Sequence, residues 1–182
     1  MYTFAGDGHF YSRDSRSDGA SSTPQMPVIS RRASVAAGRP ASDTAPSMIT
    51  ITTGGFTFSA RLERAAAPRT VAALRRLLPL TSRIIHVRWS GEAGWVPFGD
   101  LDLGLGPENA TSYPHPGQIL LYPGGVSETE ILIAYGYVRF ASKAGQLAGN
   151  HCATIETGHD QLRLLGKKIL WEGAQDITIT EP

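Results

Sequence analysis

Residues 107–136 read PENATSYPHPGQILLYPGGVSETEILIAYG. This stretch holds two short apolar runs, Gln118–Tyr122 and Glu130–Tyr135, each bounded by Pro and Gly residues. Short runs rich in Ile and Leu between turn residues are typical of buried β-strands. The PGG sequence at 123–125 cannot continue a regular ladder and marks a turn between them. The stretch therefore predicts two neighbouring strands with polar loops at their ends.

The flanking sequence alternates apolar and polar residues in the same way. Residues 49–53 and 56–63 alternate around Gly54-Gly55, which predicts a β-hairpin. The Ile-Thr pattern of 177–180 mirrors that of 49–52, so we expect these two segments to pair. Further strands are predicted at 83–90, 95–98, 137–141 and 151–156, and Pro97 makes 95–98 an edge strand or a short one.

Two short amphipathic helices interrupt the strands. Pro68 opens the first at a position where a missing N–H costs little. Asp160 is a candidate cap for the second. The predicted apolar stripes are Val71, Leu74, Leu77 and Leu78 in the first helix, and Leu162, Leu165, Ile169 and Leu170 in the second. We therefore expect a mainly β fold, a small closed eight-stranded barrel with two short helices.

Composition limits the function classes. The chain has 182 residues, is 41% hydrophobic and carries a net charge of +1, which argues against nucleic-acid or membrane-surface partners held by charge. There is no secretory signal pattern, and Cys152 is the single cysteine, so we expect a cytoplasmic protein. Residues 1–47 lack any strand or helix period, which predicts a disordered tail or an over-long gene start before a domain at 48–182.

From Met48 onward the chain resembles an uncharacterised bacterial family with a cyclophilin-like fold, the domain-of-unknown-function family 3830. The resemblance rests on RWSGE at 88–92, ENATSY at 108–113, YPGG at 122–125 and SETEIL at 127–132. It implies the cyclophilin-like barrel and no established activity. Cyclophilins carry an arginine on the strand after the first helix, and Arg88 occupies a comparable place. Their Phe-Met-x-Gln-Gly-Gly motif is replaced here by Ser90-Gly91-Glu92, so isomerase activity does not follow from the resemblance.

The candidate pocket is built around Arg88, which is costly to bury unless a carboxylate or a ligand meets it. We expect it inside the barrel wall, either holding an anionic or carbonyl group or paired with Glu92, Glu128 or Glu130. Aromatic residues would shape the pocket and Asn109 would orient the ligand, although packing and turn formation are the commoner roles of such residues. The candidate ligand-binding residues are Arg88, Trp89, Glu92, Asn109, Ser112, Tyr122, Glu128 and Tyr135.

Other chemistries are weakly supported. Glu128 and Glu130 lie two apart and could act as an acid–base pair if their environments separate their pKa values. His151 and Cys152 are neighbours in a strand and point to opposite faces, so Cys152 is expected in the core. A calcium loop at Asp100, Asp102 and Glu108 lacks the spacing of an EF-hand. No zinc or phosphate-binding motif is present, so neither a metal nor a cofactor is expected.

Three functions stay open at this stage. The first is a barrel that binds a small molecule or a peptide, with an enzymatic reaction left undecided. The second is a peptidyl-prolyl cis-trans isomerase. The third is a structural module that self-associates as a homo-oligomer.

Overall fold

The computed structural model describes residues 47–182; the predictions for the segment before it lie outside the described residues. The strands are β1 Met48–Thr53, β2 Phe56–Leu62, β3 Leu80–His86, β4 Gly91–Gly99, β5 Ala110–Thr111, β6 Gln118–Tyr122, β7 Thr129–Val138, β8 Ala141–Ser142, β9 Gly145–Gln146, β10 Gly149–Thr157 and β11 Gln175–Thr180. The helices are α1 Pro68–Arg76, the 3-10 turn η1 His159–Gln161 and α2 Leu162–Trp171. None of these helices is long and apolar enough to cross a membrane.

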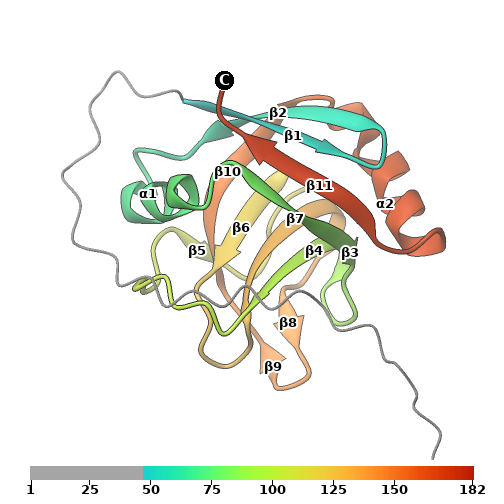
Figure 1. Cartoon of the computed structure of the whole chain (residues 1–182). Helices are drawn as coiled ribbons and strands as arrows, with labels where there is room; N and C mark the ends of the chain where they lie inside the picture. The colour runs from blue at the N-terminus through green and yellow to red at the C-terminus, as the bar shows by residue number, and fades with distance from the viewer. Residues whose placement is uncertain (1–46) are drawn as a thin grey trace, which may run out of the picture. The chain divides into compact units, whose positions relative to one another are not determined.

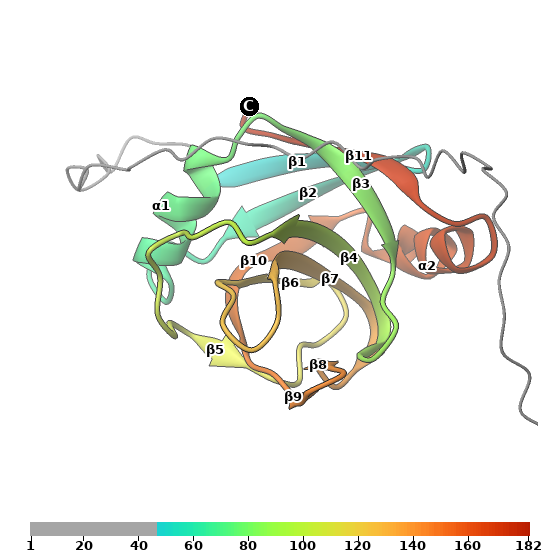
Figure 2. The same ribbon diagram turned by 60° about the horizontal axis from the view of Figure 1, so that its bottom comes forward.

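Eight antiparallel strands close into a barrel, which confirms the predicted architecture (Figures 1 and 2). Their order is β2-β1-β11-β3-β4-β7-β6-β10, and pairing of β10 with β2 closes the ring. The expected hairpin forms, with Ile51 opposite Phe58. The mirrored Ile-Thr segments also pair, with Ile51 opposite Ile179. Each barrel strand pairs with a neighbour on both sides, although β3 and β4 pair over only two residues each, and the short β5 adds to β10.

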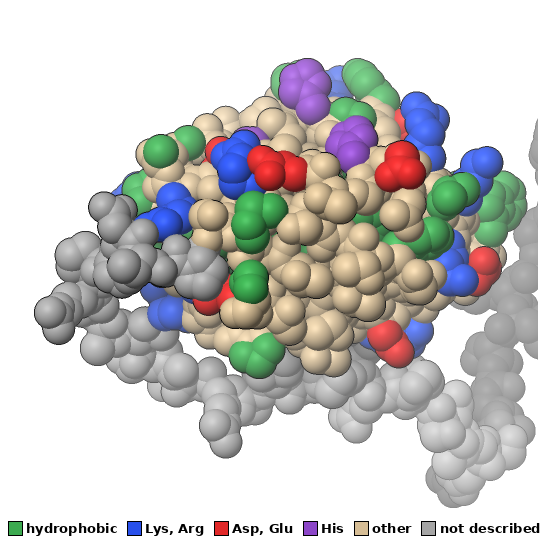
Figure 3. All heavy atoms as spheres, turned by 90° about the horizontal axis from the view of Figure 1, so that it is seen from above, with side chains coloured by type: hydrophobic (Ala, Val, Ile, Leu, Met, Phe, Trp, Pro, Cys, Tyr) green, Lys and Arg blue, Asp and Glu red, His purple; other side chains and the backbone are tan. Residues whose placement is uncertain are grey.

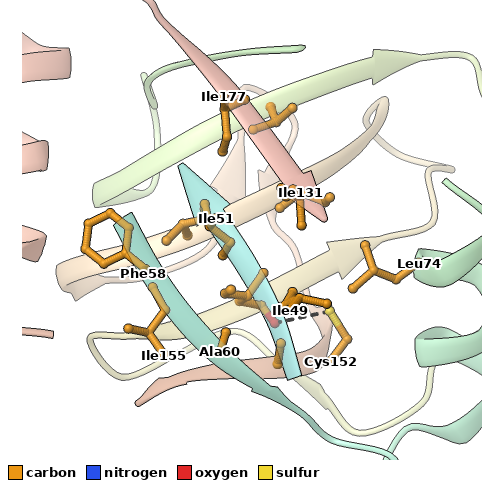
Figure 4. Packing of buried hydrophobic residues seen from close by; sticks show 14 of the residues in the cluster. Ile49, Ile51, Phe58, Ala60, Leu74, Ile131, Cys152, Ile155 and Ile177 are labelled. Atoms are coloured by element: carbon orange, nitrogen blue, oxygen red, sulfur yellow. Dashed lines mark hydrogen bonds between the residues drawn. The ribbon is translucent and has the colours of Figure 1, made fainter. Parts of the chain in front are cut away.

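The barrel interior is filled by side chains from every wall. Figure 4 shows Ile49, Ile51, Ile131 and Ile177 pointing into one apolar core, where the Cys152 thiol donates to the Ile119 carbonyl at 3.5 Å. Cys152 is thus the core residue that the sequence predicted, and burial raises its pKa to about 12. Most outward positions of β1 and β11 are Thr, and the surface above these strands is mostly tan in Figure 3, the colour of backbone and uncharged polar side chains.

Helix α1 covers one end of this core and contributes Val71 and Leu74. Helix α2 packs on β3, β4 and β7 and buries Leu162, Leu165 and Ile169, as predicted. Leu170 was predicted to be buried with them, which is wrong, since it is 49% exposed.

A second apolar cluster lies on the opposite face of β4, β6 and β7. In β7, Ile131 and Ile133 face the barrel core, while Leu132 and Ala134 face this second cluster. The segment 139–148 covers it with Phe140 and Leu147. Burial on both faces explains why β7 is a continuous apolar run instead of an alternating one.

Three predicted strands differ from the structure. β4 lies between β3 and β7 and is not an edge; Pro97 is tolerated because the ladder is irregular between Pro97 and Gly99. β3 ends at His86, four residues before the predicted end. The predicted strand at 137–141 is the end of β7 followed by the short β8.

Candidate functional site

A bulge in β7 shapes the region where the site forms. Gly91 pairs with Val138 and Ala93 with Ala134, so three residues of β7 oppose Glu92 alone. The Glu92 carboxylate accepts a hydrogen bond from the Tyr137 backbone N–H at 2.7 Å. A side chain at Gly136 would collide with that carboxylate. Glu92 therefore holds the bulge, and the Tyr137 side chain is left 75% exposed.

The exposed Tyr137 borders a hollow of about 420 Å³ on the barrel's outer surface, which we call the aromatic hollow. Its walls come from the β3–β4 connection, the end of β7 and the β8–β9 hairpin, which projects beneath the barrel in Figure 1. It is lined by Trp89, Ser90, Gly91, Tyr137, Arg139, Ala141, Gly145 and Gln146.

The two walls of the aromatic hollow are tied together beneath it. The Ser90 hydroxyl, 3% exposed, donates to the Ala141 carbonyl at 3.0 Å and accepts from the Ala141 N–H at 3.1 Å. The Arg139 N–H donates to the Ser90 carbonyl at 3.0 Å. These three bonds fix the position of Trp89 relative to Arg139.

One side-chain oxygen gathers the polar groups of the hollow. Gln146 Oε1 accepts from Arg139 Nε at 3.3 Å and from Arg139 Nη2 at 3.1 Å. The Tyr113 hydroxyl, from the segment after β5, donates to the same oxygen at 3.4 Å. The guanidinium is therefore held beside two aromatic residues, Trp89 and Tyr137, without contact to an acidic side chain of the lining.

Arg88 is the main correction to the predicted pocket. It was expected inside the barrel wall, but it is exposed, with its guanidinium 5.9 Å from the centre of the Trp95 ring. The error has a physical cause, because alternation was extended to 90 whereas β3 ends at His86. Trp89 is 59% exposed and is a wall of the hollow instead of part of the core. Arg88 lies after the end of β3 and is exposed, so its place in the structure does not support the predicted match to the cyclophilin arginine.

Tyr122 and Glu128 lie at the other end of the β6–β7 pair, near the turn at 123–125. The Tyr122 hydroxyl accepts from the Val126 N–H at 3.3 Å, and Glu128 Oε2 accepts from the Gly99 N–H at 3.2 Å. Directly opposite Tyr122 in the ladder is Glu130, which is only 7% exposed. These residues are not part of the aromatic hollow.

Glu130 is the most perturbed carboxyl in the described part of the chain. Burial raises its pKa to about 7, and the negative charge of Glu128 adds to the rise, while the Trp95 indole N–H opposes it. That N–H is buried and makes no hydrogen bond of good geometry within residues 47–182. Glu130 lines neither the aromatic hollow nor the hollow between residues 99–102 and 123–129, so its role in an acid–base pair with Glu128 stays a prediction.

Tyr135 belongs to a third place in the molecule. Its hydroxyl forms a hydrogen bond with His86 Nδ1 at 2.6 Å, and its ring packs against Gly166 of α2, where a side chain would collide with it. Burial raises the pKa of Tyr135 to about 12, and the Glu92 charge contributes. Burial lowers the pKa of His86, and the Glu92 charge opposes this shift. The pair anchors α2 to the barrel.

Asn109 and Ser112 have structural contacts. Asn109 has a positive φ of 49° and donates through its side-chain amide to the His151 carbonyl at 2.9 Å. The Ser112 carbonyl accepts from the Phe140 N–H at 2.7 Å and helps hold the segment that covers the second apolar cluster. Of the eight predicted residues, Trp89 lines the hollow and Glu92 supports it.

A second hollow of about 310 Å³ lies between residues 99–102 and 123–129. Asp100, Asp102 and Glu128 line it, but no group of acidic, His or Cys residues in 47–182 is arranged to hold a metal ion. Glu108, the third residue of the calcium hypothesis, instead accepts hydrogen bonds at the start of α1.

The sequence reasoning did not single out Tyr137, Arg139 or Gln146. One feature of the sequence could have indicated Arg139. It is an arginine between two apolar residues, Val138 and Phe140, at the end of the longest apolar strand, and both neighbours are buried. The sequence could not show that a bulge and the β8–β9 hairpin would turn these side chains toward Trp89.

The family model described as "Protein of unknown function (DUF3830)" matches residues 49–181. The chain belongs to this family. A search of curated proteins finds no match. The solved structures that share the fold include McbB in complex with tryptophan and the hypothetical protein AF2241 from Archaeoglobus fulgidus.

McbB is 20% identical, with a TM-score of 0.58 over 73% of this chain. This chain covers 44% of McbB, so it spans less than half of that protein's length. AF2241 is 14% identical, with a TM-score of 0.53 over 75% of this chain and 95% of its own length. At these identities the likeness concerns the barrel fold of this DUF3830 domain.

Proposed function

We propose that this DUF3830 domain binds a small molecule or a peptide in the aromatic hollow. The observation that carries the proposal is the exposure of Trp89 and Tyr137, at 59% and 75%, on the two walls of one hollow of about 420 Å³. Large aromatic side chains left exposed around a concave surface are typical of binding sites. The hydrogen bonds of Ser90 hold these walls in place before any ligand arrives.

The comparison with McbB supports a ligand of amino-acid size. McbB shares the barrel and has been solved in complex with tryptophan. A hollow of a few hundred Å³ suits a molecule of that size. Tryptophan is therefore the first probe to test, followed by aromatic acids, monosaccharides and Xaa-Pro dipeptides.

Ligand-detected NMR on the full chain tests the proposal with this set of probes. At least one probe should bind, and Trp89→Ala should weaken its binding about fivefold, since stacking on an aromatic ring contributes on the order of 1 kcal/mol. Trp171→Ala is the matched control, because Trp171 is 82% exposed on α2 and does not line the hollow. Both variants should keep the melting temperature of the natural sequence.

The proposal is wrong if none of the probes binds, or if Trp89→Ala binds as tightly as the Trp171→Ala control. The isomerase and self-association hypotheses have no supporting contact within residues 47–182, and both stay predictions. The Xaa-Pro dipeptides among the probes also show whether the hollow accepts a proline ligand.

A further inference from the structure

The charge in the lining of the aromatic hollow is positive only, and this limits which ligands the hollow can bind. Among its eight lining residues Arg139 is the one charged side chain, and no Asp or Glu is present. A cationic ligand would meet a like charge there. The remaining lining groups are the two aromatic rings, small residues and the amide of Gln146. The hollow therefore favours an anion over a cation.

Arg139 is held in place without being neutralised. Its Nε and Nη2 atoms both donate to Gln146 Oε1, which is the oxygen of an uncharged amide. No carboxylate within residues 47–182 forms an ion pair with it. By contrast, Arg61, Arg69 and Arg75 each meet a glutamate. Arg139 thus keeps its full positive charge, and its guanidinium orientation is fixed beside the hollow.

The geometry suits a carboxylate better than a more highly charged group. A guanidinium can bind both oxygens of a carboxylate through parallel N–H donors. A phosphate carries close to two negative charges at neutral pH and is usually met by more than one cation or by a helix N-terminus. Neither is present in the lining of the hollow.

The aromatic walls define the rest of the ligand. Trp89 and Tyr137 present most of their ring surface to solvent, and each could cover one face of a flat apolar group. The hydrogen bonds of Ser90 to Ala141 keep the two walls at a set spacing. An aliphatic acid would leave these rings exposed, whereas a planar ring would cover them.

We propose that the ligand of the aromatic hollow is an aromatic carboxylate, with Arg139 as the residue that selects for the acid. This inference rests on the proposed binding function and names the chemical class of its ligand. The carboxylate takes the free donors of Arg139, Gln146 keeps the guanidinium oriented, and the ligand ring lies against Trp89 and Tyr137.

Indole-3-acetate and indole-3-acetamide are suitable probes, because they share a ring and nearly the same size and differ in charge. Calorimetry on the full natural chain should give about tenfold tighter binding of the acetate. Arg139→Gln should abolish this preference, because it weakens binding of the acetate far more than that of the acetamide, which carries no charge to pair with the guanidinium. Gln146→Glu should also abolish it, because a carboxylate in that position would neutralise Arg139 without changing the shape of the hollow.

Arg139→Lys keeps the positive charge but loses the planar pair of donors, so it should retain only part of the preference. Unchanged melting temperatures show that these exposed substitutions leave the barrel folded. Equal affinity of the natural protein for acetate and acetamide overturns the carboxylate inference while the binding function stands. Failure of both indoles to bind also overturns the inference. In that case the wider set of probes, compared between the natural protein and Trp89→Ala, decides separately whether the hollow binds any ligand.

Discussion

Glu130, which is 7% exposed and lies opposite Tyr122 in the sheet, makes the stability of this domain depend on pH. Its native pKa of about 7 lies above the ordinary value of 4.5, so the folded state holds a proton that the unfolded state has lost between these two values. Stability should therefore fall as pH rises through that window and stay lower above it. The difference is on the order of 3 kcal/mol.

Glu130→Gln removes this titration while keeping the shape of the side chain. In urea denaturation the variant should gain stability relative to the natural protein as pH is raised from 5 to 8. Glu128→Gln is the matched companion, because loss of its negative charge lowers the pKa of Glu130 and moves the upper end of the window down. A Glu130→Gln effect of the same size at both pH values would contradict the assignment.

At the level of elements, α1 depends on a distant residue for its N-terminus. Ala67 at the N-cap offers no side-chain acceptor. Glu108 supplies one instead, accepting from the Thr70 N–H at 2.7 Å and the Arg69 N–H at 3.3 Å. Burial alone would raise the pKa of Glu108, but these hydrogen bonds outweigh it and lower the pKa. The carboxylate is thus a cap provided by another segment.

Glu108→Ala should cost about 1–2 kcal/mol of unfolding free energy, the usual effect of losing a helix cap, and should speed amide exchange in the first turn of α1. Glu172→Ala is the control. Its carboxylate pairs with Lys168 on the surface of α2, so its loss should cost about 0.5 kcal/mol or less. Equal losses in the two variants would show that Glu108 does not act as a cap.

Local patterns predicted the elements better than they predicted the contacts between them. Pro68 at the start of α1, three of the four residues in the α2 stripe and the hairpin around Gly54 depend on neighbouring residues and are confirmed. The Glu108 cap joins residues 38 apart in the sequence, which no periodicity reports. Arg88 was misplaced for a similar reason, since only the end of β3 decides where alternation stops.

For the whole molecule, the number of short strands and turns predicted a closed barrel, and the pairing of β10 with β2 confirms it. The mirrored Ile-Thr segments at the two ends of the domain pair as expected. The aromatic hollow was not predictable in the same way. It requires the β7 bulge opposite Glu92 and the hairpin at 141–146, which together bring Tyr137 and Gln146 to Trp89. Trp89 was the part of the predicted site that could be recognised from the residue type alone, because a large aromatic side chain beside a turn is a common pocket wall.

Barrel closure also predicts where the chain can be shortened. All strand pairings of the barrel lie between Met48 and Thr180. A chain that begins at Ser47 should therefore unfold in one transition, with the melting temperature and urea m-value of the full sequence.

A chain that begins at Gly54 loses β1, which exposes one edge each of β2 and β11 and removes Ile49 and Ile51 from the core. It should fail to give a cooperative transition, because removing two fully buried isoleucines and a barrel strand exceeds the 5–15 kcal/mol or so that stabilise a typical domain. Differential scanning calorimetry on the two chains measures both outcomes; a lower melting temperature for the chain beginning at Ser47 would mean that residues before it stabilise the barrel.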